Sequence, residues 1–157
     1  MKEGLELLNF KELSPKELEM VLEWRNTKEI QKWMLTREDI SLQTHLNFVN
    51  SLANAKDKEF FLVKDENSPI GVINFTDITP KSCSFGLYKN PQINGVGDKL
   101  MRTICDYAFN RLKIDKLKAE VFTNNEKAIQ LYKKYNFIEK QRVKYKEREL
   151  ILMELQR

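Results

Sequence analysis

Apolar residues recur along this chain in two rhythms, every second residue in some segments and every third or fourth residue in others. The first rhythm is typical of half-buried strands and the second of helices that bury one face. The segments with strand character are 4–10, 59–64, 70–77, 82–90, 116–123, 137–142 and 147–155, and those with helical character are 14–26, 41–53, 98–112 and 125–135. The pattern therefore predicts a mixed α/β fold.

The first helix has a clear start signal. Ser14 is a good N-cap, Pro15 suits the first helical position, and Glu17 stands three residues after the cap. The inward-facing stripe of this helix is expected to consist of Leu18, Val21, Leu22 and, against the apolar trend, Arg25. An unpaired guanidinium on that stripe is costly, so Arg25 is expected to meet either a carboxylate, carbonyl oxygens or a ligand phosphate.

A turn near residue 26 separates this helix from the second one, and it carries Ile30, Trp33 and Met34. In the second helix Leu42, Leu46, Val49 and Ala53 are expected to face inward, with His45 and Phe48 along the same side. A buried histidine is most often a hydrogen-bonded core residue, and this interpretation stands beside a role in a binding pocket.

The order of the elements restricts the topology. The strands at 59–64, 70–77 and 82–90 follow one another through short turns, which favours an antiparallel meander. The next strand, at 116–123, comes after a helix, and a strand–helix–strand unit requires parallel pairing with a right-handed crossover. No repeat, low-complexity segment or linker interrupts the chain, so a single domain over residues 1–157 is expected.

A glycine turn from Gln92 to Gly97 joins the strand at 82–90 directly to the helix that begins near Asp98. Glycine lets the backbone approach a ligand closely, and the first N–H groups of a helix favour an anion. On its own, such a turn more often serves only to connect a strand to a helix. Between the strand at 82–90 and the helix that begins near Asp98, it predicts a phosphate site.

Composition narrows the classes of partner. The 157 residues carry a net charge of +4, and the basic residues are spread along the chain rather than clustered with aromatics, so a nucleic-acid partner is not expected. A small polyphosphate ligand would account for the positive net charge equally well. No apolar run reaches membrane-spanning length and the N-terminus lacks a secretory pattern, which favours a cytoplasmic protein.

Metal and thiol chemistry are not expected. The chain has two cysteines, without a CxxC pair, and one histidine, which is too few ligands of the usual kind for a zinc site. Cys105 shares a helix face with Met101, Ile104 and Ala108 and is interpreted as a small core residue.

The glycine turn and the later block from Leu117 to Phe137 together resemble the GNAT superfamily of acetyl-CoA-dependent N-acetyltransferases. The resemblance implies a mixed, mostly antiparallel sheet with a central, splayed parallel strand pair, flanked by helices. It also implies that acetyl-CoA lies in the splay. By this resemblance, the coenzyme-binding positions are Leu87, Gly95, Val96, Gly97, Asp98 and Asn125. The chain has Ile93 and Asn94 where the family often carries a basic residue.

The chemistry of acetyl transfer needs two further groups. An alkyl ammonium must lose a proton before it attacks a thioester, and the departing thiolate leaves more easily when a neutral phenol donates to it. Glu120 is the candidate base and Tyr132 the candidate acid, with a backbone N–H near Leu87 or Tyr88 as the oxyanion donor. Taken alone, Glu120 faces either solvent or a cleft, and Tyr132 fits an ordinary core aromatic.

The first half of the chain resembles, more narrowly, the N-acetyltransferases that modify the 4-amino group of a UDP-linked 4-amino-4,6-dideoxy-N-acetyl-altrosamine in pseudaminic acid biosynthesis. A pocket for such an acceptor is expected to have aromatic or thioether side chains that contact the uracil and sugar, and a basic side chain that binds the diphosphate. The implied acceptor residues are Arg25, Trp33, Met34, His45, Phe48 and Tyr88. Two other functions stay open, namely acetylation of a protein N-terminus and non-catalytic binding of acetyl-CoA. An oligomer is possible but not required.

Overall fold

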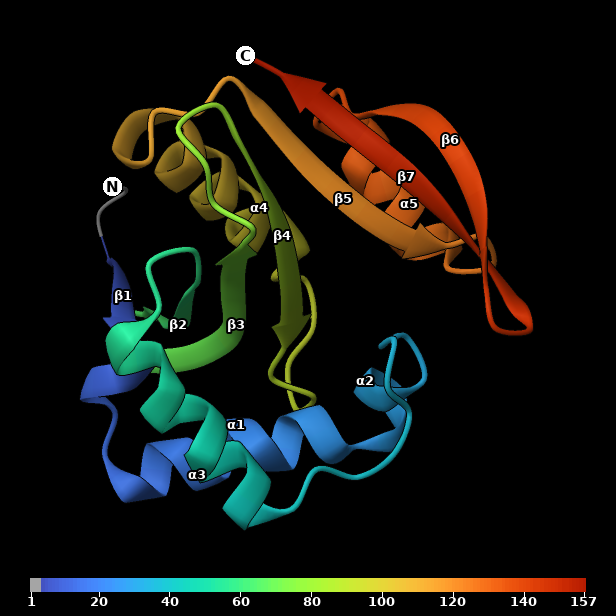
Figure 1. Cartoon of the computed structure of the whole chain (residues 1–157). Coiled ribbons are helices and arrows are strands. Elements are labelled where there is room, and N and C mark those ends of the chain that lie inside the picture. Colours follow the sequence, from blue (N-terminus) through green and yellow to red (C-terminus); the bar gives the residue numbers. More distant parts are fainter. Residues whose placement is uncertain (1–3) are drawn as a thin grey trace.

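The computed structural model describes residues 4–157 and contains one mixed sheet of seven strands in the order β1-β2-β3-β4-β5-β7-β6 (Figure 1). All neighbouring strands are antiparallel except β4 and β5, which are parallel. The expected meander and crossover are therefore confirmed. The strands are β1 (Leu5–Asn9), β2 (Glu59–Asp65), β3 (Ser68–Thr76), β4 (Ser82–Lys89), β5 (Lys116–Phe122), β6 (Ile138–Tyr145) and β7 (Arg148–Gln156).

Helices cover both faces of the sheet. They are α1 (Pro15–Asn26), α2 (Lys28–Gln31), α3 (Leu42–Ser51), α4 (Gly97–Asp106) and α5 (Glu126–Lys134), with short 3-10 turns at Phe10–Glu12 and Leu52–Asn54 and a π-helical turn at Tyr107–Arg111. Helices α1 and α3 lie together at one end of the molecule, whereas α4 crosses behind β4 (Figure 1).

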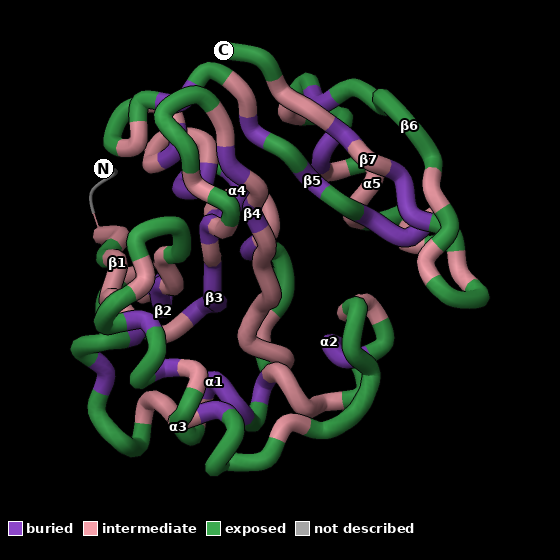
Figure 2. Tube along the Cα trace, viewed as in Figure 1, coloured by how far each residue is buried: buried purple, intermediate pink, exposed green. Residues whose placement is uncertain are grey.

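Alternation along the central strands places neighbouring residues in two separate cores. Leu62 packs with Val21 and Trp24 of α1, whereas Val63, the next residue, packs with Leu100 of α4. Figure 2 shows the buried residues concentrated on β3, β5 and α4, while most of β6 is exposed. A sheet buried on both faces in this way holds its central strands firmly, and β4 is one of them.

The start of α1 is built as its sequence predicts. The Ser14 hydroxyl accepts a hydrogen bond from the Glu17 backbone N–H at 3.2 Å, and the Glu17 carboxylate accepts one from the Ser14 N–H at 3.0 Å. This capping box satisfies two otherwise unpaired donors and fixes where α1 begins. It therefore also fixes the place of Arg25 in the last turn of α1.

Two expectations about the second helix are wrong. Leu42 and Ala53 are both exposed, Leu42 at 43%. Leu42 is the first residue of α3, directly after the Ser41 cap, and points beyond the core. At the other end the α-helix stops at Ser51 and a 3-10 turn follows, so the residue that reaches the core is Leu52 rather than Ala53.

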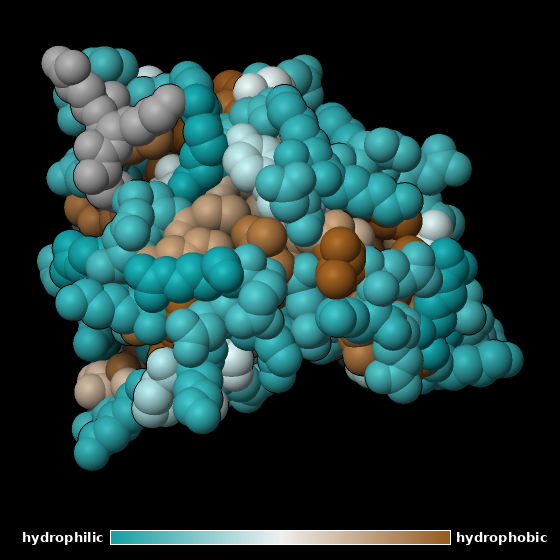
Figure 3. Space-filling model, turned by 90° about the horizontal axis from the view of Figure 1, so that it is seen from above, coloured by the Kyte–Doolittle hydropathy of each residue, from teal (hydrophilic) through white to brown (hydrophobic). Residues whose placement is uncertain are grey.

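The surface fits the charged composition. The face drawn in Figure 3 is largely hydrophilic, with apolar side chains showing through near its middle. Within residues 4–157, no helix has both the length and the apolar character that crossing a bilayer requires.

Gly71 of β3 lets α4 pack directly against the sheet. A Cβ on Gly71 would lie 2.8 Å from a methyl group of Leu100 in α4 and 2.8 Å from the backbone oxygen of Tyr88 in β4. The Leu100 methyl can rotate away, but the strand backbone cannot. The absence of a side chain here thus sets the spacing between α4, β3 and β4.

We expect Gly71→Ala to lower the free energy of unfolding by about 1–3 kcal/mol, because the added methyl overpacks a buried site. Gly97→Ala is the matched control, since its Cβ would meet only the flexible tip of Leu131 at 3.3 Å. Chemical denaturation of both variants measures the difference. Equal stability of Gly71→Ala and the unaltered protein would contradict this packing account.

Candidate active site

Strands β4 and β5 pair only briefly and then separate. Their parallel register covers Ser82–Ser84 against Lys116–Lys118, although β4 continues to Lys89 and β5 to Phe122. Figure 1 shows the two strands together at one end and diverging toward the other. The expected splayed pair is confirmed, and its open end exposes two backbone edges.

The direction of the β4 backbone groups follows from its pairing with β3. Asn90 donates its N–H to Ile70 at 2.9 Å, and in an antiparallel pair the residues alternate between facing the partner and facing away. The backbone N–H and C=O of Tyr88 therefore point toward β3, like the N–H of Asn90. The N–H of Leu87, one residue earlier, points the other way, into the gap toward β5. Of the two predicted oxyanion donors, the geometry favours Leu87.

The gap opens into a cleft of about 1060 Å³ that joins both halves of the molecule. Of the predicted coenzyme residues, Val96 does not border this cleft, because its side chain is buried in the core, so that only its main chain is available. All other predicted site residues border it: Leu87, Gly95, Gly97, Asp98, Asn125, Glu120, Tyr132, Arg25, Trp33, Met34, His45, Phe48 and Tyr88.

The glycine loop presents the start of α4 without a side-chain cap. Gly95 has φ +76°, and apart from Gly95 itself and its two chain neighbours, no atom of the described residues lies within 4 Å of the position that a Cβ would occupy. Val96 is the N-cap, and within the described part of the chain no side chain bonds to the first backbone N–H groups of α4. An uncapped helix start beside an open cleft can receive an anion, so this loop fits a coenzyme diphosphate.

Asp98 brings a negative charge close to this helix start, but its side chain is already engaged. Its carboxylate lies 2.8 Å from the Lys134 ammonium and 3.0 Å from the Tyr135 hydroxyl, both on or next to α5. The hydrogen bond from Lys134 is the main reason that the pKa of Asp98 is lowered. Lys134 offsets the charge of Asp98 and ties α5 to the loop.

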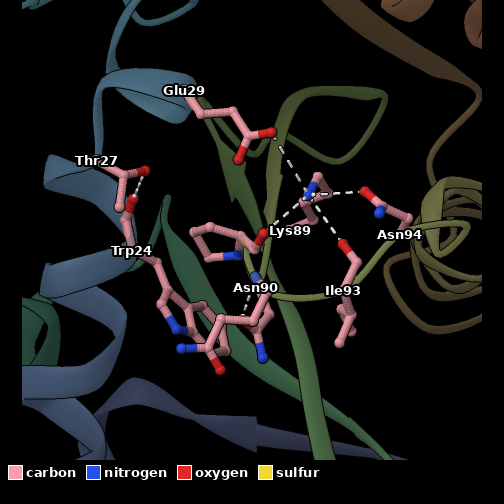
Figure 4. Close-up of polar contacts among 9 residues, drawn as sticks. Trp24, Thr27, Glu29, Lys89, Asn90, Ile93 and Asn94 are labelled. Carbon is pink, nitrogen blue, oxygen red and sulfur yellow. Dashed lines mark hydrogen bonds and ion pairs between the residues drawn. The ribbon is translucent and has the colours of Figure 1, made fainter.

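Lys89, the last residue of β4, folds over the loop from the strand side (Figure 4). Its ammonium donates to the Ile93 carbonyl at 2.8 Å and lies 3.4 Å from the Asn94 side-chain oxygen. It also lies 3.8 Å from the Glu29 carboxylate in α2. The loop lacks a basic residue at 93 and 94, and the strand supplies a cation next to these same two positions.

Glu120 and Tyr132 reach the cleft from β5 and α5. The Glu120 side chain is exposed on its strand between buried Ala119 and Val121, and it faces the cleft. Tyr132 is buried, with its ring perpendicular to that of Phe85 at 5.4 Å and tilted against Phe137 at 5.8 Å. Burial raises the pKa of Tyr132 above that of a free phenol. The hydroxyl is therefore protonated near pH 7, as in an ordinary tyrosine, and can serve as a hydrogen-bond donor.

Asn125 caps α5 and has a further donor to spare. Its side-chain oxygen accepts from the Ala128 N–H at 3.3 Å, and its amide nitrogen is left to bond elsewhere. This arrangement makes it a structural cap at the edge of the cleft as well as a candidate contact for the coenzyme.

Arg25 and His45, the two polar residues predicted to contact the acceptor, differ in character. Arg25 donates to the Thr36 carbonyl at 2.9 Å, forms no ion pair with a carboxylate of residues 4–157, and keeps a buried nitrogen without a hydrogen-bond partner. Desolvation lowers its pKa. His45 has its Nε2 3.0 Å from the Leu18 carbonyl and is a hydrogen-bonded core residue at the border of the cleft.

Sequence reasoning missed several residues around the cleft. Phe122 and Lys89 border it, and Arg148 stacks on Phe122 with its guanidinium 3.4 Å from the ring centroid. The position of Lys89 at the end of a strand before a glycine loop was a usable signal. Arg148 lies among the charged residues of a hairpin turn, and its sequence context gave no signal of a role at the cleft.

Residues 4–157 contain no cluster of three or more histidine, cysteine, aspartate or glutamate side chains that could hold a metal ion. Both cysteines are free, and burial raises the pKa of each thiol to about 11. Cys105 packs against the core as its helical position predicted.

Comparison with known proteins agrees with this geometry. Residues 8–138 match the family described as acetyltransferase (GNAT) domain. The chain is 44% identical over 133 residues to the acetyltransferase PseH of two Campylobacter jejuni strains, an alignment that covers 85% of this chain and 84% of the relative.

Solved structures give the same result. The crystal structure of Campylobacter jejuni N-acetyltransferase PseH has a TM-score of 0.83 and 38% identity, covering 98% of this chain and 99% of that one, and the same values hold for its complex with acetyl coenzyme A. A Vibrio cholerae spermidine N-acetyltransferase shares the fold alone, with a TM-score of 0.86 at 20% identity and coverage of 99% and 96%. The extent of the family match and the identity to its members establish that this chain belongs to the GNAT family of acetyltransferases.

Proposed function

We propose that this protein is an acetyl-CoA-dependent N-acetyltransferase that acetylates the 4-amino group of a UDP-linked 4-amino-4,6-dideoxy-N-acetyl-altrosamine. One observation carries the proposal. A single cleft is bordered on one side by an uncapped helix start and a free strand edge, and on the other by aromatic residues and an arginine with a spare donor.

The coenzyme half is supported by backbone geometry. The diphosphate fits the N–H groups of residues 95–98, and the pantetheine amides fit the unpaired edge of β4 at Leu87 as an added strand would. The structure of the relative PseH from Campylobacter jejuni is known in complex with acetyl coenzyme A, which supports acetyl-CoA as the ligand of this half.

The chemistry follows from the groups at the splay. Glu120 accepts a proton from the acceptor ammonium, directly or through water, so that the neutral amine attacks the thioester carbonyl. The Leu87 N–H donates to the oxygen on which negative charge develops. Tyr132 donates its phenolic proton as the C–S bond breaks, and the second proton of the attacking nitrogen passes to the resulting tyrosinate, which leaves the neutral amide and the free thiol.

The acceptor half suits a nucleotide-sugar better than an extended peptide. Trp33, Met34, Phe48 and Tyr88 supply flat or polarizable apolar surfaces, and Arg25 supplies a positive charge for a diphosphate. A peptide N-terminus would instead favour an open groove with acidic residues. Cytoplasmic location and a single domain over residues 1–157 belong to the same proposal.

The direct test is release of free thiol from acetyl-CoA with a panel of UDP-amino-sugars and of peptides with free N-termini. We expect turnover with the 4-amino UDP-sugar and none with the peptides. Turnover only with peptides would overturn the acceptor assignment. Acetyl-CoA binding without turnover on any acceptor would favour a binding protein.

Removal of one hydroxyl tests the proposed acid. Tyr132→Phe keeps the ring that packs on Phe85 and Phe137, so stability and coenzyme affinity should change little. We expect kcat to fall by about 10² or more, the usual size of a general-acid contribution. Tyr145→Phe, on the half-exposed end of β6, is the control. A kcat within twofold of that control would exclude Tyr132 as the acid.

The proposed base has a distinct pH signature. Glu120→Gln should lower kcat/KM by about 10²-fold near pH 7, and the deficit should narrow as pH rises, because the acceptor amine then loses its proton without help. Glu6→Gln on the exposed side of β1 is the control. Steady-state rates between pH 6 and 10 measure both. A deficit that stays constant over this range would argue against proton removal by Glu120.

A further inference from the structure

The segment from residue 28 to residue 40, called here the arm, forms one wall of the acceptor half. It contains α2 and the turn that carries Trp33 and Met34, both half-buried and both at the cleft. In Figure 1 the arm extends from the end of α1 to a position below the open ends of β5 and β7. Its position decides how closely the acceptor wall faces the coenzyme half.

The base of the arm is held from its own side. The Asn26 side chain bonds to both the N–H and the carbonyl of Ile40, at 2.8 and 2.9 Å, and closes the segment into a loop. Within the arm, the Gln31 amide donates to Asp39 at 2.7 Å. These contacts fix where the arm begins and ends, but they do not fix its outer part to the strands across the cleft.

Arg148, the first residue of β7, makes that connection. Its Nη1 donates to the Lys32 carbonyl at 3.1 Å, and in the described chain this is the one hydrogen bond between the arm and strands β5 to β7. The same guanidinium lies 3.4 Å from the ring centroid of Phe122, which is buried and borders the cleft. Phe122 and Glu120 are two residues apart on β5 and so share a face of that strand.

The guanidinium of Arg148 is suited to hold the arm in one position. A guanidinium is planar and can stack on a ring while its edge donates to a carbonyl, which an ammonium cannot do. Removal from water lowers the pKa of Arg148, and Arg37 of the arm adds a like charge. One of its nitrogens is buried without a partner. One guanidinium thus uses its face for Phe122 and its edge for the Lys32 carbonyl, which fixes its orientation through two contacts.

The opposite side of the arm is held less firmly. There the Lys89 ammonium lies 3.8 Å from Glu29, whose side chain is 55% exposed (Figure 4). An exposed pair at this separation contributes little in water. The arm thus has one hydrogen bond across the cleft, from a guanidinium that also stacks on Phe122, and one solvated ion pair beside the glycine loop.

We propose that Arg148 is a positioning residue for the acceptor. By clamping the Lys32 carbonyl over Phe122, it holds Trp33 and Met34 at a set distance from the strand that carries Glu120. The kinetic consequence rests on the function proposed above, whereas the effect on the arm itself does not.

Hydrogen exchange of the ligand-free protein tests the clamp without any assumption about activity. We expect Arg148→Met, which keeps an apolar stem on Phe122 but loses the donor, to speed exchange in peptides from the arm by about tenfold, the usual worth of a hydrogen bond from a charged group. Arg148→Lys should fall between. Arg142→Met is the control, because Arg142 is exposed on β6 and, among residues 4–157, forms ion pairs only with Glu139 and Glu149.

Kinetics then separate positioning from general damage. Arg148→Met should raise KM for the UDP-amino-sugar by about five- to tenfold while the Kd for coenzyme A stays within twofold. Exchange in the arm equal to that of Arg142→Met would overturn the proposal, and so would faster exchange spread equally over β5 to β7. If the acceptor assignment fails, the exchange result still decides the role of Arg148. If Arg148→Met does not fold, hydrogen exchange in the arm of Arg148→Lys is compared with that of Arg142→Met instead.

Discussion

The separation of β4 from β5 after three paired residues is the constraint on which the site depends. Backbone N–H and C=O groups inside a protein need partners, and a strand edge that opens into a cleft has none from its own sheet. Here the edge at Leu87 faces the gap, while the burial of β3 and β4 between two layers of helices keeps β4 from moving across to close it. A ligand with amides of its own can supply the missing partners.

The two halves of the cleft are lined by different kinds of group, one mainly by backbone and the other by side chains. On the side proposed for the coenzyme, the edge of β4 and the start of α4 offer main-chain groups, which do not depend on the side chains of Ile93 and Asn94. The acceptor half uses side chains from α1, α3 and the arm. The fold itself is shared with a spermidine N-acetyltransferase at 20% identity.

Local signals in the sequence were sufficient for most of the fold and for the glycine turn that leads into α4. The capping box at Ser14, the glycine turn and the alternation along the strands each act within a few residues, so their outcomes are readable without tertiary contacts. The errors arose where geometry changes within an element. The shift from α-helix to 3-10 turn after Ser51 exchanged Ala53 for Leu52 in the core, and the helix from Gly97 ends in a π-helical turn rather than running on to Leu112.

Contacts between distant segments were beyond such reasoning. Arg148 and Lys32 are far apart in the chain, and nothing near either residue indicates that a carbonyl of one will meet the guanidinium of the other. Arg25 could be singled out only because it interrupts an apolar stripe, and its actual partner, the Thr36 carbonyl, was one of several possibilities. The identity of the acceptor came from resemblance to a family and not from periodicity or charge.

A crystal structure of the protein with coenzyme A bound tests the central claim most directly. The account predicts the pantetheine chain between β4 and β5, with an amide bonded to the backbone of Leu87, and the diphosphate on the N–H groups of residues 95–98. Coenzyme A bound elsewhere, with the gap between the two strands filled by protein side chains, would contradict it.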